Sequence, residues 1–413
     1  MQSSSAPASS EFRQGWKPLL AAFIGAACGI NAIPFYTHGV FVVPVSQEFG
    51  WSRGATQFAF SFVMMAAVVL APFIGGIIDR VGARRIAIPS VIAVGVGFAA
   101  ISFTGSSIWS YYALWIGMAL IGTGTNPVTW TRVVAQWFQR NRGLALGITM
   151  AGTGVVGTFA PVIASNAIQD YGWRSAYQLL GLGIAVVGAP VLYFFFRDRP
   201  VSPPSSDVER QDDSTQGLTL SEAVRGYRFW ALGVAMLLIC GCVAGLITNL
   251  VPMLTDKGLT RGQAAGYASL VGISVIIGRI IAGYLIDLFW APAVGFVFLI
   301  APAITCVLLT GEVTPSLLTV IVPLIGLAAG AELDMLAFMT ARYFGMKNYG
   351  AIYGVQFGFF AVGSGFAPAI FGAVFDNVGG YGPILLISAV CFVVGSVLLL
   401  LLGRYPVFDS AKA

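Results

Sequence analysis

Apolar runs of about twenty residues recur along almost the whole 413-residue chain. Twenty residues of α-helix are long enough to cross the hydrocarbon core of a bilayer. Charged residues make up only 9% of the chain, against roughly a quarter in soluble domains, which leaves too few to cover a soluble surface. The sequence therefore predicts an all-α integral membrane protein with many membrane-spanning helices.

We predict twelve such helices, in two sets of six. They lie near residues 18–45, 56–78, 86–104, 109–136, 143–167, 175–196, 229–254, 263–288, 292–310, 315–341, 349–374 and 382–403. The polar leader at 1–17 has no cleavage signal and is expected to be a disordered cytoplasmic tail. A Pro-, Ser- and Asp-rich stretch at 197–228 is predicted to be a cytoplasmic linker between two six-helix halves, at 18–196 and 229–404. A cytoplasmic tail at 405–413 ends the chain.

Basic residues indicate the orientation. With both ends in the cytoplasm, 17 of the 22 Lys and Arg residues fall on the cytoplasmic side and four on the other. The positive-inside rule therefore favours cytoplasmic termini, in a bacterial inner membrane. The net charge of +5 follows from the same bias, so we expect the lipid bilayer and no nucleic acid as a partner.

Cysteine and histidine do not suggest a metal or catalytic centre. All five cysteines fall inside predicted spans, where they behave as small buried apolar residues. No zinc-type spacing occurs, and the chain has a single histidine. We expect no metal, no cofactor and no enzymatic activity.

The two halves repeat each other. Five markers recur at offsets of 206 to 208 residues. They are Arg53 with Arg261, Asp79 with Asp287, Gly143 with Gly350, Phe159-Ala160-Pro161 with Phe366-Ala367-Pro368, and Asp170 with Asp376. Parallel repeats of this kind are typical of secondary transporters, whose substrate site lies between the halves near the bilayer midplane.

The loop after the second span resembles a known signature. It carries Gly75, Asp79, Arg80, Gly82, Arg84 and Arg85 in the order Gly-x3-Asp-Arg-x-Gly-x-Arg-Arg. This pattern resembles that of the major facilitator superfamily, and the likeness extends over the full chain. It implies two pseudo-symmetric halves that move a small solute by alternating access.

Charges that occur in both halves are interpreted as architecture, and charges found in one half as candidates for transport chemistry. Arg279 belongs to the second group, because its counterpart by the repeat is Ala71. A guanidinium is costly at this depth and marks a substrate or ion pathway by default. Its planar fork fits a carboxylate in two-point contact, so we predict an anion site. The structural alternative is a permanent salt bridge to Glu332 or Asp334.

Glu332 and Asp334 on the tenth span also lack charged counterparts. Two residues correspond to about 200° around a helix, so the two side chains should point to nearly opposite faces. One is expected to titrate during transport while the other locks the helix to a neighbour. Glu332 is favoured for the cavity because Asp334 lies more nearly on the face of Arg342. In the alternative, both acids are structural.

Other polar residues are candidates of lower specificity. His38 shares a helix face with Asn31, and its pKa near neutrality suits a proton carrier or a substrate contact, although it can equally be a plain hydrogen-bonded histidine. Further candidates for the substrate site are Tyr36, Asn126, Trp130, Asn249, Tyr353 and Gln356. A gating or structural role is assigned to Asp79, Arg80, Arg84, Asp287 and Arg132.

The glycine-rich stretch "GITMAGTGVVGTFAP" lies within a span, where small residues permit close helix packing. It departs from the Gly-x-x-x-Gly-Pro-x-x-Gly-Gly pattern of drug/proton antiporters, which weighs against drug efflux.

The eighth span resembles that of the monocarboxylate and oxalate–formate transporter branch, with Gly278-Arg279 followed by Gly283 and Asp287. The likeness implies that Arg279 binds a substrate carboxylate. Oxalate–formate exchangers carry a lysine where Gln356 stands, so one cation here favours a monoanion. Animal monocarboxylate carriers place an aspartate where Val275 stands, which leaves proton coupling to Glu332 or His38.

We therefore predict a monomeric secondary transporter of a short-chain or aromatic monocarboxylate, driven by a proton. The alternatives are a carboxylate exchanger without a proton, and efflux of a neutral or cationic drug or sugar. A membrane sensor or enzyme is disfavoured because no soluble domain longer than the linker is predicted.

Overall fold

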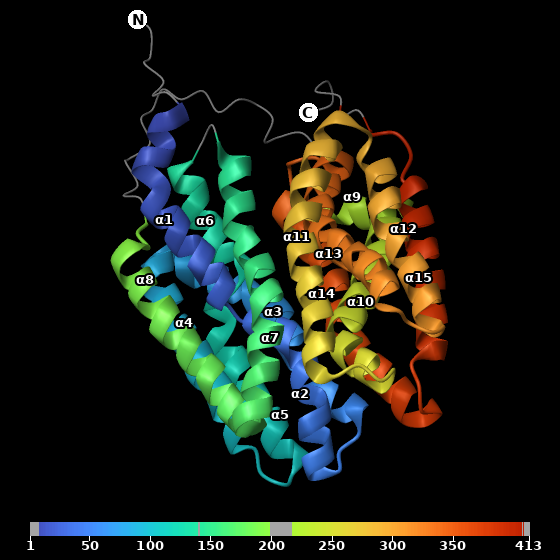
Figure 1. Ribbon diagram of the computed structural model, residues 1–413. Helices are drawn as coiled ribbons and strands as arrows, with labels where there is room; N and C mark the ends of the chain where they lie inside the picture. The colour runs from blue at the N-terminus through green and yellow to red at the C-terminus, as the bar shows by residue number, and fades with distance from the viewer. Residues whose placement is uncertain (1–7, 139–140, 199–216, 407, 409–413) are drawn as a thin grey trace, which may run out of the picture.

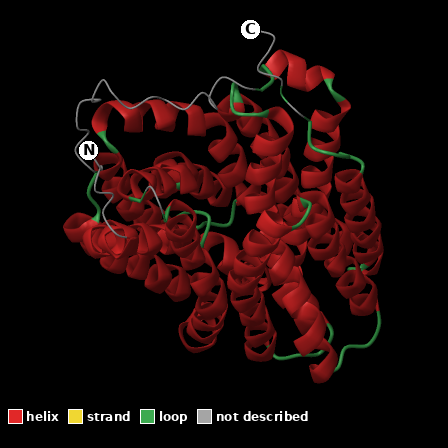
Figure 2. Ribbon diagram, turned by 90° about the horizontal axis from the view of Figure 1, so that it is seen from above, coloured by secondary structure: helices red, strands yellow, loops and turns green. Residues whose placement is uncertain are grey.

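The computed structural model describes residues 8–138, 141–198, 217–406 and 408, and these form helices without a named strand (Figures 1 and 2). Two bundles stand side by side. The first contains α1 (Ala8–Cys28), α2 (Ile33–Phe49), α3 (Arg53–Val81), α4 (Ala83–Ala100), α5 (Ile108–Gly122), α6 (Pro127–Trp137), α7 (Arg142–Gly183) and α8 (Ala189–Phe195). The second contains α9 (Leu220–Arg225), α10 (Tyr227–Asp256), α11 (Arg261–Leu288), α12 (Ala291–Thr310), α13 (Pro315–Phe344), α14 (Tyr349–Val378) and α15 (Gly382–Leu400).

The described helices make twelve passes through the molecule, six in each bundle. α1 with α2, and α5 with α6, each form one broken pass. α7 bends at Gly172, so it supplies one whole pass and begins the next, which continues through a π-helix (Ile184–Gly188) into α8. Length and hydropathy alone single out ten candidate spans instead of twelve. The two passes within 143–195 are counted as one span, and the broken α5–α6 pass is missed. The predicted twelve-helix membrane fold is confirmed.

The ends of the bundle serve as reference points. The start of α1 and the end of α15 lie at one end, here called the termini end (Figure 1). The turn between α2 and α3 lies at the opposite end, called the far end.

Proline explains where two passes break. Pro34 stands in the first turn of α2 and Pro127 in the first turn of α6. A proline has no N–H and a fixed φ, so it fits the first turn of a helix. The breaks bring two amides together, and Asn31 Nδ2 donates to Asn126 Oδ1 at 2.8 Å.

The two halves meet where small residues let backbones approach. α3 packs along α14 and α7 along α11. A Cβ atom on Gly272 of α11 would overlap the backbone of Gly157 and Thr158 on α7. A Cβ on Gly372 of α14 would lie 2.6 Å from the nitrogen of Gly54. The predicted role of the glycine-rich stretch in helix packing is therefore confirmed.

Three predicted boundaries change. The leader was expected to be disordered, which is wrong for residues 8–17, because α1 begins at Ala8 and Phe12 packs on Phe138 with ring centroids 5.0 Å apart. Of the predicted linker, 199–216 lies outside the described residues. The part that follows docks on the second half, where Leu218 N donates to Phe344 O at 2.8 Å. In the predicted C-terminal tail, the Tyr405 hydroxyl accepts from Ala291 N at 3.0 Å.

Candidate functional site

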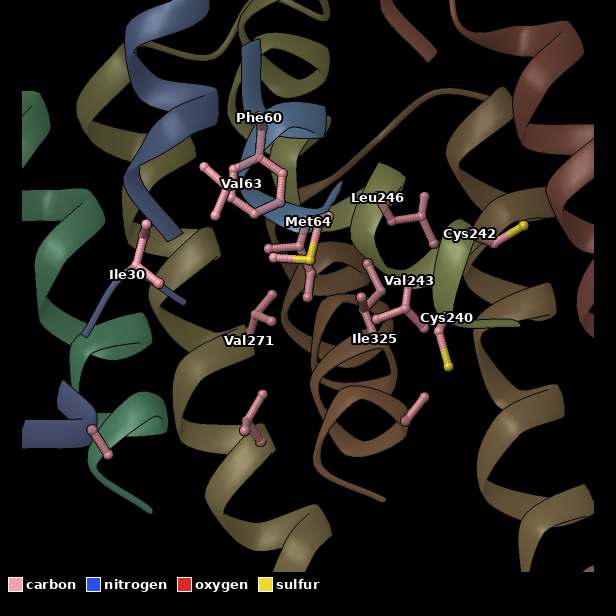
Figure 3. Packing of buried hydrophobic residues seen from close by; sticks show 14 of the residues in the cluster. Ile30, Phe60, Val63, Met64, Cys240, Cys242, Val243, Leu246, Val271 and Ile325 are labelled. Carbon is pink, nitrogen blue, oxygen red and sulfur yellow. The ribbon is translucent and has the colours of Figure 1, made fainter. Parts of the chain in front are cut away.

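A cavity of about 120 Å³ lies between the two halves. Its walls come from the α1–α2 pass, α3, α6 and α7 on one side and from α10, α11, α13 and α14 on the other. The repeat relates these elements pairwise, since Arg53 in α3 corresponds to Arg261 in α11 and Gly143 in α7 to Gly350 in α14. Figure 3 shows part of the region, including the lining residues Phe60 and Met64 of α3 and Val243 of α10.

Arg279 on α11 lines this cavity. Its side chain is only 10% exposed, and Nε lies 3.2 Å from Asp334 Oδ2 in an ion pair that lacks hydrogen-bond geometry. Nη1 is buried and finds no hydrogen-bond partner in the described part of the chain. Two glycines let α11 and α13 approach closely here. A Cβ atom on Gly278 would overlap the α13 backbone at Leu327, and one on Gly330 would overlap the α11 backbone at Val275.

The two acids of α13 take different positions around that guanidinium. Glu332 lines the cavity, is 8% exposed, and its Oε2 has no partner among the described residues. Asp334 does not belong to the cavity wall, and 40% of its side chain is exposed. The salt bridge considered as the structural alternative is therefore formed by Asp334, but only at Nε of Arg279. Nη1 stays unpaired.

Four predicted site residues line the cavity together: Arg279, Glu332, Asn31 and Tyr36. Three neutral polar residues in the wall have side-chain donors that are already engaged. Asn31 Nδ2 bonds to Asn126, Thr153 Oγ1 donates to Met150 O at 2.8 Å, and Ser364 Oγ donates to Cys240 O at 3.3 Å. Asn31 Oδ1 remains unpartnered as an acceptor among the described groups.

Several lining residues were not predicted, and the repeat is the signal that could have found them. Met150 and Phe357 are 207 residues apart, as are Thr153 and Phe360, and all four line the cavity. Phe35 with Val243, and Tyr36 with Ala244, are 208 residues apart and also line it. Equivalent helix positions in the two halves thus face the same space.

Two predicted polar residues lie beside the cavity wall rather than in it. Asn126 is 8% exposed and accepts from Asn31. Tyr353 stacks on Tyr349 with ring centroids 5.6 Å apart and lies 6.3 Å from the ring of Phe357.

The remaining predicted polar residues are buried in helix contacts. Asn249 is fully buried and paired with Gln57, and Gln356 Nε2 donates to Phe229 O at 2.9 Å. Trp130 Nε1 donates to Thr125 O at 2.9 Å. None of the three belongs to the cavity wall in this conformation.

His38 is also placed away from the cavity. It is 1% exposed, packs edge-on against Trp115 with ring centroids 5.0 Å apart, and lies 5.8 Å from Phe60. Neither ring nitrogen has a hydrogen-bond partner among the described residues.

The residues assigned to gating or structure lie near the termini end. Arg84 Nη2 donates to Tyr193 O at 2.5 Å, and Asp198 accepts from the backbone nitrogens of Ala83 and Arg84 at the start of α4. Arg80 and Asp287 are exposed, and Arg132 is half-buried with a partner. The side chain of Asp79 lies outside the described residues.

Arg53 links the halves at the far end. Its guanidinium contacts Asp256 at 2.5 and 2.9 Å and the Tyr381 hydroxyl at 3.2 Å. Asp376 accepts from the backbone nitrogens of Arg53 and Gly54 at 2.9 and 2.8 Å. The architectural role predicted for charges that occur in both halves is seen for Arg53, whereas its counterpart Arg261 forms no ion pair in the described part of the chain.

A sequence model of the Major Facilitator Superfamily matches residues 22–336. The chain belongs to the major facilitator superfamily. It is 26% identical over 411 residues to an uncharacterized MFS-type transporter of Bacillus subtilis, covering 97% of each chain. It is 25% identical to monocarboxylate transporter 12 of Mus musculus, covering 93% of this chain and 84% of that one.

A solved structure shares the fold. The chain matches the crystal structure of a bacterial homolog of the human lysosomal transporter Spinster, captured inward-facing and unoccupied. The TM-score is 0.66 at 16% identity, over 96% of each chain. Together these findings make the protein an integral membrane transporter and not an enzyme.

Proposed function

We propose that the protein is a proton-coupled symporter of an organic monocarboxylate, acting as a monomer in a bacterial inner membrane. The observation that carries the proposal is the buried, unpartnered Nη1 of Arg279 at the wall of a cavity between the halves. A buried cationic donor without a partner is costly unless a ligand or water satisfies it. The monocarboxylate transporters among the relatives support the same chemistry.

In the mechanism we propose, the carboxylate binds the free edge of Arg279 and takes over from Asp334 as its counter-charge. The guanidinium therefore stays neutralised by the substrate when the cavity closes, which keeps the electrostatic cost of closing low. Glu332 receives the proton, because it is the buried acid of the same cavity and has a free oxygen. Substrate and proton thus enter one space between the halves.

The links between the halves support an access route from the termini end. Arg53, Gly54, Gln57 and Ser61 in the first three turns of α3 all bond to the second half, at the far end. With the termini in the cytoplasm, as the positive charges favour, this conformation opens towards the cytoplasm.

Binding and transport assays test the proposal. We expect small monocarboxylates to raise the thermal unfolding temperature of the purified protein. Arg279→Ala should weaken that binding at least about tenfold, because a hydrogen bond to a charged group contributes about 1.5–3 kcal/mol. Arg279→Lys keeps the positive charge but loses the planar guanidinium fork, so its affinity for the carboxylate should lie between those of the native protein and Arg279→Ala.

Uptake into sealed vesicles tests the coupling. An imposed inward proton gradient should accelerate uptake by the native protein but not by Glu332→Gln. Uptake that ignores the gradient in the native protein would refute proton symport, and carboxylate binding that survives Arg279→Ala would refute the anion site.

A further inference from the structure

The cavity has aromatic walls from both halves. Phe35 and Tyr36 of α2 have ring centroids 5.0 Å apart, and Phe60 of α3 lies 5.5 Å from Phe35. On the other side, Phe357 and Phe360 of α14 are stacked at 5.3 Å. All five rings line the same cavity, so a ligand between them contacts both halves at once.

The polar content of the same walls is small. Arg279 offers a free cationic edge, the Tyr36 hydroxyl forms no hydrogen bond with the described residues, and the buried acceptors left over are Glu332 Oε2 and Asn31 Oδ1. The hydroxyl donors of Thr153 and Ser364 bond to backbone carbonyls of the protein itself. A ligand that matches these walls carries one anionic group and an otherwise apolar body.

The volume limits the size of that body. An apolar cavity of about 150 Å³ admits a benzene ring, and this cavity, of about 120 Å³, is of the same order. A space of this size suits a single ring, with the acidic group of the ligand at Arg279 in the wall.

We propose that the transported acid carries a single aromatic ring, or an equally flat apolar body, held between the Phe35–Tyr36–Phe60 rings and the Phe357–Phe360 pair while Arg279 holds its carboxylate. This rests on the proposed function and narrows it from monocarboxylates in general to arylalkyl acids. Aromatic rings favour offset or edge-on contacts at centroid distances of about 4.5–7 Å, and such contacts add to the effect of burial. The ligand ring would thereby join the halves as they close.

A panel of five probes tests the proposal by binding to the purified native protein: acetate, lactate, cyclohexanecarboxylate, phenylacetate and phenylacetamide. We expect phenylacetate to bind about a hundredfold or more tighter than acetate, since it buries a whole ring. Phenylacetamide, which lacks the charge, should bind far more weakly than phenylacetate. Equal affinities for acetate, lactate and phenylacetate would overturn the ring proposal and leave the monocarboxylate function standing. Equal affinities for phenylacetate and its amide would overturn the function as well.

A matched pair of variants locates the effect. Phe360→Leu removes a wall ring, and we expect about a tenfold loss for phenylacetate with little change for acetate. Phe359→Leu is the control, because the adjacent Phe359 packs against Gly233 and Trp230 outside the cavity wall. The unfolding temperature without ligand identifies any variant that folds poorly, and Phe357→Leu then replaces it. An equal loss in the wall variant and the control would contradict the proposed ring site.

Discussion

A guanidinium presents five N–H donors in one plane, and in this protein a single carboxylate contacts only one edge of it. Asp334 lies at Nε of Arg279, whereas Nη1 is buried without a partner among the described residues. The pair with Asp334 lacks hydrogen-bond geometry, so it is weaker than a two-point contact between a guanidinium and a carboxylate. Under the proposed function, a substrate carboxylate therefore competes with a weakly held partner.

Asp334→Asn removes this competitor, and we expect carboxylates to bind about fivefold tighter, since a partly exposed ion pair contributes up to about 1 kcal/mol. The measurement is ligand-induced thermal stabilisation or calorimetric titration of the purified variant. Glu332→Gln is the matched change two residues away, and it should not produce the same gain because Glu332 makes no ion pair with Arg279. Weaker binding in Asp334→Asn would mean that the pair instead positions the guanidinium for its ligand.

The sequence could predict the charged members of the site but not all of its amides. Arg279 and Glu332 stand out because the repeat gives them no charged counterpart, and both line the cavity. Asn249 and Gln356 are also polar, but their side chains donate hydrogen bonds to neighbouring helices, to Gln57 and to the Phe229 carbonyl. Periodicity gives the face of one helix, but which neighbour meets that face depends on packing between helices, which a single sequence does not specify.

At the scale of helices, the repeat predicted which elements correspond but not which of their contacts are made. The start of α3 is held by Asp376, at the end of α14. The start of α11 is instead closed by its own capping box, in which Thr260 and Gln263 bond to each other's backbone. The starts of two repeat-related helices thus have different surroundings. The contact with an acid at the end of another helix forms at α3 but not at α11 in this conformation.

Arg53→Gln should loosen the far end of the interface between the halves. Losing a partly exposed ion pair with Asp256 costs up to about 1 kcal/mol, so we expect about a fivefold shift towards conformations open at that end. Spin labels on Ser107 and Gly311, exposed residues in loops of the two halves, should report longer distances.

Arg261→Gln provides the control for this change. It alters the repeat counterpart of Arg53, which forms no ion pair in the described part of the chain, so the label distances should stay as in the native protein. If both variants lengthen them equally, the Arg53 ion pair is not what holds the far end closed.

For the whole molecule, the twelve-helix architecture was predictable because each pass needs only an apolar run of sufficient length. The breaks within two of the passes could not be predicted, because Pro34 and Pro127 each fit either a kink or the first turn of a new helix. The fold alone does not indicate which end of the protein faces the cytoplasm, whereas the distribution of Lys and Arg predicts it.

Cysteine labelling tests the predicted orientation. A cysteine at Ser107, in the loop before α5 at the far end, should react with a membrane-impermeant maleimide in intact cells. A cysteine at Met346, between α13 and α14, should react only after the membrane is opened. The native cysteines give little background, as four of the five are buried. The reverse pattern would place the termini outside the cell.

The crossing of α7 and α11 has a consequence for mutational tolerance. Gly272 cannot gain even a methyl group without pushing the two backbones apart. A saturation screen scored by growth on the acid proposed as substrate would therefore show this position to be as intolerant as Arg279. The two could be told apart by protein abundance, because a lost glycine disturbs assembly and a lost arginine disturbs only recognition.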